Sequence, residues 1–189
     1  IGAEQHGHMD SVGYEMYCSL LEEAVREQKG IETEKTTETT IDLPVSAYIP
    51  EGYIRDHSKR IGAYKKIASI DSKETLFDVY DELEDRYGTI PASVSNLMDI
   101  ALIKKYASLF GISEITGNYE QVIMRFDTEN LPDMQNSVNL MQERPKELFM
   151  TNPKEPVLHF KLKKPAKGEE AIYLKAVCDL MEQLNVNKL

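Results

Sequence analysis

The side chains that could bind a metal ion lie close together near residue 1. His6 and His8 are two residues apart, with Glu4 and Asp10 on either side. Imidazole nitrogens and carboxylate oxygens are common ligands of divalent ions. The sequence has neither a closely spaced cysteine pair nor the helical HExxH pattern that zinc sites use. We therefore expect no metal at these residues.

Other catalytic chemistry is equally hard to assign. The sequence contains no GxxxxGK[ST] run, whose backbone amides and lysine hold nucleotide phosphates, so we expect no ATP bound in that way. No Ser/His/Asp or Cys/His arrangement is readable either. The densest carboxylates lie on the polar side of one expected helix, where a solvated face explains them more simply than acid–base catalysis. They are Asp78, Asp81, Glu82, Glu84 and Asp85. We expect no catalytic residue and no cofactor in this chain.

A second charged group comes just before these carboxylates, on an expected helix with four basic residues, Lys59, Arg60, Lys65 and Lys66. The whole chain is nevertheless acidic, with a formal net charge of −10. Duplex DNA is bound largely through phosphate neutralisation by lysine and arginine, so we do not expect this piece to bind DNA by itself. Solubility is the simplest explanation of the acidic surplus. A docking surface for a basic partner is the alternative.

Length and composition indicate an ordinary globular protein. The 189 residues suit one domain with an appendage. Of these residues 41% are hydrophobic and 29% charged, and no apolar run reaches the roughly 18 residues of a membrane span. No export signal is recognisable, so a cytoplasmic location without membrane contact is expected. Cys18 and Cys178 have apolar neighbours, which favours reduced, buried thiols.

The elements that would position these groups begin with an amphipathic helix that should end at Gly30. Its apolar face holds Met16, Tyr17, Leu20, Leu21, Ala24 and Val25. Residues 31–39 are rich in Thr and Glu and are predicted to form a linker. A short strand at residues 41–45 follows, and Pro44 predicts that it lies at a sheet edge.

Three helices with clear boundary signals are expected next. Asp56 precedes the first, Asp71 and Glu74 offer a capping box for the second, and Pro91 suits the first turn of the third. Gly88 and Gly111 should end the second and third helices. The expected apolar faces are Ile61, Tyr64, Ile67 and Ala68; Leu76, Val79, Tyr80, Leu83 and Tyr87; and Val94, Leu97, Met98, Ala101 and Leu102.

Beyond Gly111 the apolar period changes from 3.6 to 2. Gly117-Asn118 predicts a hairpin turn, and residues 122–126 and 158–162 alternate as half-buried strands do. Helices are expected at residues 131–144, with a stripe of Met134, Val138 and Met141, and at residues 173–184. The predicted fold is α+β: a helical core with a small, mainly antiparallel sheet, preceded by an isolated N-terminal loop and helix.

The opening residues carry a family resemblance. The run Gly2, Glu4, Gln5 and Gly7, followed by an amphipathic helix, resembles the end of the translocation motif in RecG-type DNA motors and in the bacterial transcription-repair coupling factor family. The resemblance implies that Gln5 couples ATP hydrolysis to movement on duplex DNA.

Later segments resemble only the second of these families. Leu43-Pro44, Tyr48-Ile49-Pro50, the run from Arg60 to Ala68 and the run from Glu82 to Pro91 resemble the C-terminal domain of the coupling factors, which RecG-type helicases lack. The resemblance implies three regions: a motor tail at residues 1–30, a linker at 31–39 and a C-terminal regulatory domain at 40–189.

In this family the parent protein is a translocase driven by ATP and Mg that displaces stalled RNA polymerase and recruits excision repair. The resemblance implies that the C-terminal domain has no chemistry of its own. It would dock on an N-terminal module similar to the excision nuclease subunit and mask the surface for the damage-recognition ATPase. The charged faces Lys59, Arg60, Lys65, Lys66, Asp78, Asp81, Glu82 and Asp85 are the candidate docking residues. A structural cap, or a completing part of the DNA motor, is the alternative.

Overall fold

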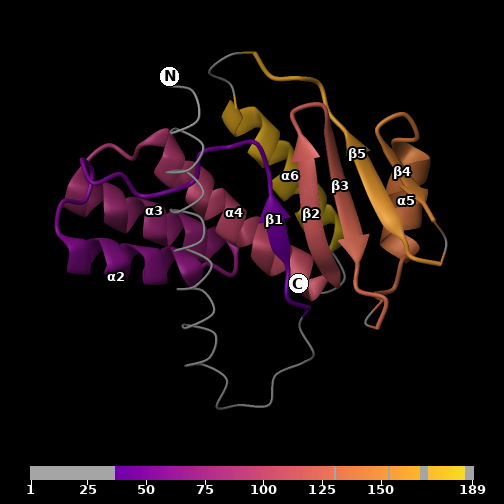
Figure 1. Cartoon of the computed structure of the whole chain (residues 1–189), viewed down its shortest axis with the longest axis horizontal. Coiled ribbons are helices and arrows are strands. Elements are labelled where there is room, and N and C mark those ends of the chain that lie inside the picture. Colours follow the sequence, from indigo (N-terminus) through magenta and orange to yellow (C-terminus); the bar gives the residue numbers. More distant parts are fainter. Residues whose placement is uncertain (1–36, 130, 153, 167–169, 186–189) are drawn as a thin grey trace, which may run out of the picture. The chain divides into compact units, whose positions relative to one another are not determined.

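The structure is a computed structural model that describes residues 37–129, 131–152, 154–166 and 170–185 (Figure 1). The predicted N-terminal loop and helix, Cys18 and most of the predicted linker lie outside the described residues. The chain divides into two units. Among the described residues, 45–102 belong to the first unit, and 37–44 with 103–185 belong to the second.

The first unit contains α2 (His57–Ala68), α3 (Lys73–Tyr87) and the start of α4 (Ala92–Leu109). Asp56 caps α2 as expected, since its carboxylate accepts a hydrogen bond of 2.8 Å from the Lys59 amide. The tightly packed side chains of this unit include Ile49, Ile54, Ala63, Tyr64, Ile67, Val79, Leu83, Val94, Leu97 and Met98. Ile61, expected on the buried face of α2, is only half-buried, and Ala63 is buried instead.

The expected capping box of α3 was wrong by one residue. Ser72, rather than Asp71, is the N-cap, and its hydroxyl accepts a hydrogen bond from the Thr75 amide at 3.2 Å. The Thr75 hydroxyl accepts one in return from the Ser72 amide at 3.0 Å. Glu74 therefore lies one position too early to close the box.

The second unit is built on a five-stranded sheet with the order β1-β2-β3-β5-β4. The strands are β1 (Thr40–Asp42), β2 (Ile112–Asn118), β3 (Gln121–Phe126), β4 (Leu148–Thr151) and β5 (Val157–Lys161). β1 pairs with β2 in parallel, and the other pairings are antiparallel. The predicted fold class is thus confirmed, and β1 is an edge strand as expected. β4 was not predicted.

Two further helices, α5 (Gln135–Glu143) and α6 (Glu170–Leu184), belong to the second unit. The expected apolar side chains of α6 are all buried: Tyr173, Val177, Leu180, Met181 and Leu184. The Tyr173 ring meets the Tyr119 ring edge to face, with 5.3 Å between centroids, which ties α6 to the β2–β3 turn. Cys178 is buried and forms no disulfide within the described residues, in agreement with the prediction of a reduced, buried thiol.

The predicted turn of the β2–β3 hairpin was two residues too early. Tyr119 and Glu120 form the connection, because Asn118 is still paired with Gln121. The Asn118 side-chain oxygen accepts hydrogen bonds from the Glu120 and Gln121 amides, at 2.9 and 3.0 Å. Gly117 lies within the ladder, where a Cβ would approach the Gln121 carbonyl oxygen to 2.5 Å. Glycine is needed there for close strand approach rather than for the turn.

The predicted helix at residues 131–144 was too long, and its stripe was misplaced. α5 begins at Gln135, whose amide is bound by the Asp133 carboxylate at 3.0 Å. Ser137 is completely buried, whereas Val138 is 39% exposed. The prediction started the helix at Leu131, but this side chain is exposed and precedes α5.

The first described residues, just before β1, are already packed within the second unit. Thr37 and Thr39 were predicted to belong to the linker, but both side chains are buried. The Thr39 hydroxyl donates to the Ile112 carbonyl at 2.7 Å, and the Ser108 hydroxyl donates to the Thr37 carbonyl at 2.7 Å. These bonds attach the segment before β1 to the second unit.

Asp99 on α4 should make the stability of the chain depend on pH. Burial raises the pKa of its carboxyl from 3.8 to about 6. Since the folded-state pKa is the higher one, this contribution to stability is fully present below pH 3.8 and is lost as pH rises through 6. Asp99→Asn should therefore raise the free energy of unfolding at pH 7.5, by up to about 3 kcal/mol, and change it little at pH 4.

Urea denaturation at the two pH values would measure this difference. Asp78→Asn, at an exposed position of α3, is the matched control and should show no such difference between pH values. Equal destabilisation of Asp99→Asn at both pH values would contradict the account.

Candidate docking surface on helices α2 and α3

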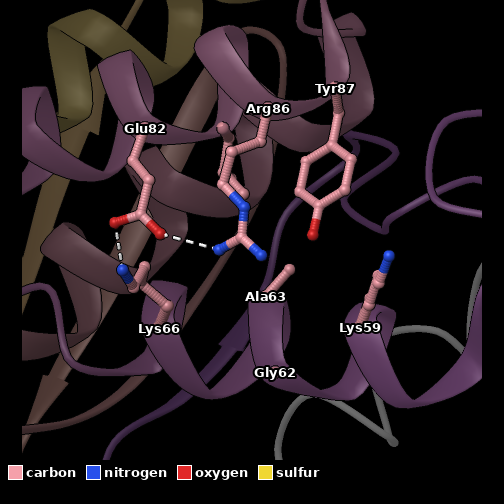
Figure 2. A pocket seen from close by; sticks show the side chains of 8 residues that line it. Lys59, Gly62, Ala63, Lys66, Glu82, Arg86 and Tyr87 are labelled. Carbon is pink, nitrogen blue, oxygen red and sulfur yellow. Dashed lines mark hydrogen bonds and ion pairs between the residues drawn. The ribbon is translucent and has the colours of Figure 1, made fainter.

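The two predicted charged faces meet at one ion-paired cluster. Lys66 on α2 donates to one carboxylate oxygen of Glu82 on α3, and Arg86 donates to the other at 3.0 Å (Figure 2). The hydrogen bond from Lys66, and then that from Arg86, holds the pKa of the Glu82 carboxyl below its usual range. Lys66 and Glu82 are thus engaged with each other. An exposed pair of this kind contributes about 0–1 kcal/mol to stability.

Arg60 also has an internal role. Its guanidinium donates to the Ile54 carbonyl at 2.9 Å and to the Glu51 carboxylate at 3.2 Å. The side chain is only 15% exposed. Arg60 therefore fixes the loop before α2, and little of it can contact a partner.

The other candidate residues remain accessible. Lys59, Asp78, Asp81 and Asp85 are exposed, and Lys65 is half-buried. Within the described ranges, the three carboxylates and Lys59 have no ion-pair partner. The structure thus separates the eight predicted docking residues into three with internal bonds and five with charges open to a partner.

Sequence reasoning missed one exposed apolar side chain on the same helix. Phe77 on α3 is 63% exposed. Asp81 and Glu84 follow it by four and seven residues, so all three share one face of α3. The sequence could have indicated this exposure, because Phe77 falls outside the apolar stripe that the spacing predicts for this helix.

A groove of about 170 Å³ runs between α2 and α3. It is lined by Lys59, Gly62, Ala63 and Lys66 of α2 and by Glu82, Leu83, Arg86 and Tyr87 of α3. Figure 2 shows the Lys66–Glu82 pair at one end, Lys59 and Tyr87 at the other, and Arg86 between them. The Arg86 guanidinium carbon lies 5.4 Å from the centroid of the Tyr87 ring.

The described residues contain neither a metal-binding cluster nor a membrane-spanning helix. Within the described residues, no group of three or more His, Cys, Asp or Glu side chains could hold a metal ion. No helix in the same residues is long and apolar enough to cross a bilayer. Gly2, Glu4, Gln5 and Gly7 lie outside the described residues, so the coupling role of this motif stays a prediction.

Comparison with known protein families shows which family the chain belongs to. The TRCF domain model matches residues 43–137, which is half of the sequence and includes α2, α3, α4 and the β2–β3 hairpin. The chain belongs to the TRCF domain family. The predicted resemblance to the C-terminal domain of the coupling factors is thereby confirmed.

Individual relatives agree with this membership. The chain is 35% identical over 147 residues to the transcription-repair-coupling factor of Staphylococcus haemolyticus, a match that covers 77% of this chain and 13% of that protein. It is 44% identical over 109 residues to the factor of Bacillus subtilis, with 57% and 9% covered. The chain thus spans about a tenth of the length of these relatives.

A solved structure shares the fold. The crystal structure of the C-terminal domain of a transcription-repair coupling factor superimposes with a TM-score of 0.67 at 23% identity. The match covers 82% of this chain and 99% of the solved one. The shared fold therefore extends beyond the residues that the family model matches.

Proposed function

We propose that this chain is the C-terminal regulatory domain of a transcription-repair coupling factor and that its docking restrains the parent protein. The parent would be an ATP-driven DNA translocase that displaces stalled RNA polymerase and recruits nucleotide excision repair. The observation that carries the proposal is the TRCF match, because the matched residues include the whole charged surface of α2 and α3. The docking partner would be the excision-nuclease-like module at the N-terminus of the same protein.

The charges of the surface support a reversible contact. Asp78, Asp81 and Asp85 have no ion-pair partner among the described residues, and a basic partner surface would neutralise their carboxylates. Exposed charge pairs contribute only about 0.2–1 kcal/mol each, so several together give a contact that can form and open. The part of the predicted linker that precedes residue 37 would keep the domain near its partner when the contact opens. Restraint by such docking can be released when polymerase is engaged.

A structural cap is the competing interpretation, with the domain stabilising its neighbour without regulating it. A completing part of the DNA motor is the other. The carboxylates of α3 suit a contact that opens, because in the open state they are exposed to solvent and cost little without partners, whereas a permanent contact would not need them to be stable in water.

Reversing two of these charges should weaken the restraint. In the intact parent protein, Asp78→Lys combined with Asp81→Lys should raise ATP hydrolysis roughly fivefold, since losing about 1 kcal/mol of docking energy changes an equilibrium by that factor. Binding of the damage-recognition ATPase should rise in parallel, because the same opening exposes its surface.

The control changes charge by the same amount elsewhere. Glu120→Lys combined with Glu143→Lys alters two exposed residues of the second unit and should leave both activities unchanged. If the α3 variant behaves like this control while its thermal stability is normal, the acidic face does not dock.

A further inference from the structure

We propose that the groove between α2 and α3 binds an Asp or Glu side chain of the docked partner module. The inference rests on the proposed function and adds the chemistry by which the partner is recognised. Lys59 and Arg86 would hold the incoming carboxylate, and the Tyr87 hydroxyl would donate a hydrogen bond to it.

The shape of the groove follows from the spacing of small residues. Lys59, Gly62, Ala63 and Lys66 share one face of α2, because residues three, four and seven apart lie on the same side of a helix. A Cβ built on Gly62 meets nothing within 4 Å. The space directly above Gly62, between the two lysines, is therefore open.

The charges of the groove are not balanced. Three cations, Lys59, Lys66 and Arg86, face one carboxylate, Glu82. Glu82 is satisfied by Lys66 and Arg86, and it leaves Lys59 without an ion-pair partner in the described part of the chain. Arg86 uses one guanidinium nitrogen in this bond and keeps further N–H donors. Within a chain of net charge −10, this groove is a local site of positive charge.

The surroundings favour a protein carboxylate over nucleic acid. Asp78 and Asp85 are four residues before and three residues after Glu82, so they form an acidic rim on the flank of α3. A phosphate backbone would bring several negative charges against this rim. A single Asp or Glu side chain can enter the groove alone while Lys or Arg neighbours on the same partner segment face the rim. The partner segment should therefore combine one acidic residue with flanking basic residues.

Carbodiimide cross-linking detects such a contact directly, because it joins an amine to a carboxylate only when the two touch. The full 189-residue chain would be mixed with the rest of the parent protein, expressed as a separate chain, and cross-linked peptides identified by mass spectrometry. Lys59 should be joined to an Asp or Glu of the partner, whereas Lys175, exposed on α6, should not. The Lys66–Glu82 pair supplies an internal positive control.

Binding titrations with the same partner test the groove independently. Lys59→Glu should weaken binding about tenfold, because it replaces an attraction by a repulsion. Gly62→Gln should also weaken binding, since it fills the groove without altering charge, and glutamine is a better helix former than glycine. Lys175→Glu, with the same charge change at an exposed position of α6 that is not a candidate docking residue, should change binding no more than about twofold.

The possible failures are distinguishable. If the wild-type chain does not bind the partner at all, the proposed function fails and the inference with it. If the wild-type chain binds but Lys59→Glu and Gly62→Gln bind equally well, the groove inference alone is overturned. The groove inference would also be overturned if Lys59 were cross-linked to the chain's own residues in the absence of the partner. The same holds if duplex DNA displaces the partner from the wild-type chain but not from Lys59→Glu, since the groove would then bind DNA.

Discussion

Deleting residues 40–189 from the intact parent protein should raise its rate of ATP hydrolysis by as much as tenfold. If docking of this domain stabilises a restrained state of the motor, deletion shifts the population toward the active state. A restraint of about 1.4 kcal/mol corresponds to a tenfold change. Steady-state hydrolysis by the truncated and intact proteins would be compared at equal concentration with and without DNA.

Binding of the damage-recognition ATPase is the second measurement on the same pair of proteins. It should also increase after deletion if docking of this domain covers the surface that this ATPase binds. Unchanged or lower hydrolysis, together with no gain in partner binding, would favour the structural cap. Deletion that lowers hydrolysis and abolishes translocation would favour a completing part of the motor.

Phe110→Ala should destabilise the chain by about 3–5 kcal/mol, a large share of the total stability of a domain. Phe110 follows α4 and is 2% exposed. Its ring meets the Phe126 ring of β3 edge to face, with 5.9 Å between centroids. Truncation leaves a cavity between helix and sheet within the second unit and removes this aromatic contact. Urea denaturation followed by circular dichroism gives the change in unfolding free energy.

Phe77→Ala is the matched control because it removes the same side chain from an exposed position of α3. It should change the unfolding free energy by less than about 0.5 kcal/mol. Similar losses for the two variants would contradict the assignment of Phe110 to the core and of Phe77 to the free surface.

The fold was predictable wherever one face of an element is buried. The α6 residues Tyr173 and Met181 and the β3 residues Val122 and Met124 are almost inaccessible, and their spacing alone predicts a helix and a strand. Burial of one face of a helix or strand produces the periodic spacing of apolar residues from which the element is predicted. For the same reason, Val138 misled the prediction of α5, because this short helix buries Ser137 beside an exposed apolar residue.

Other features depend on contacts between distant residues. β4 was missed because its four residues, Leu148–Thr151, are too few to show an alternating pattern, and pairing with β5 is what defines them as a strand. Within the candidate site, charge patterns identified Lys66 and Glu82 as surface groups. Their mutual ion pair joins two helices across 16 positions of sequence, which no local pattern records. Arg60 was likewise assigned to docking although the Ile54 carbonyl binds it.

Adding this domain back to a truncated parent tests the central claim most directly. The 189-residue chain would be titrated into parent protein that lacks residues 40–189, while ATP hydrolysis is followed. The account predicts a saturable fall in hydrolysis toward the rate of the intact protein, a weaker response with Asp78→Lys/Asp81→Lys, and an unchanged response with Glu120→Lys/Glu143→Lys. Hydrolysis that stays at the truncated level at every concentration of the added chain, despite measurable binding, would contradict it.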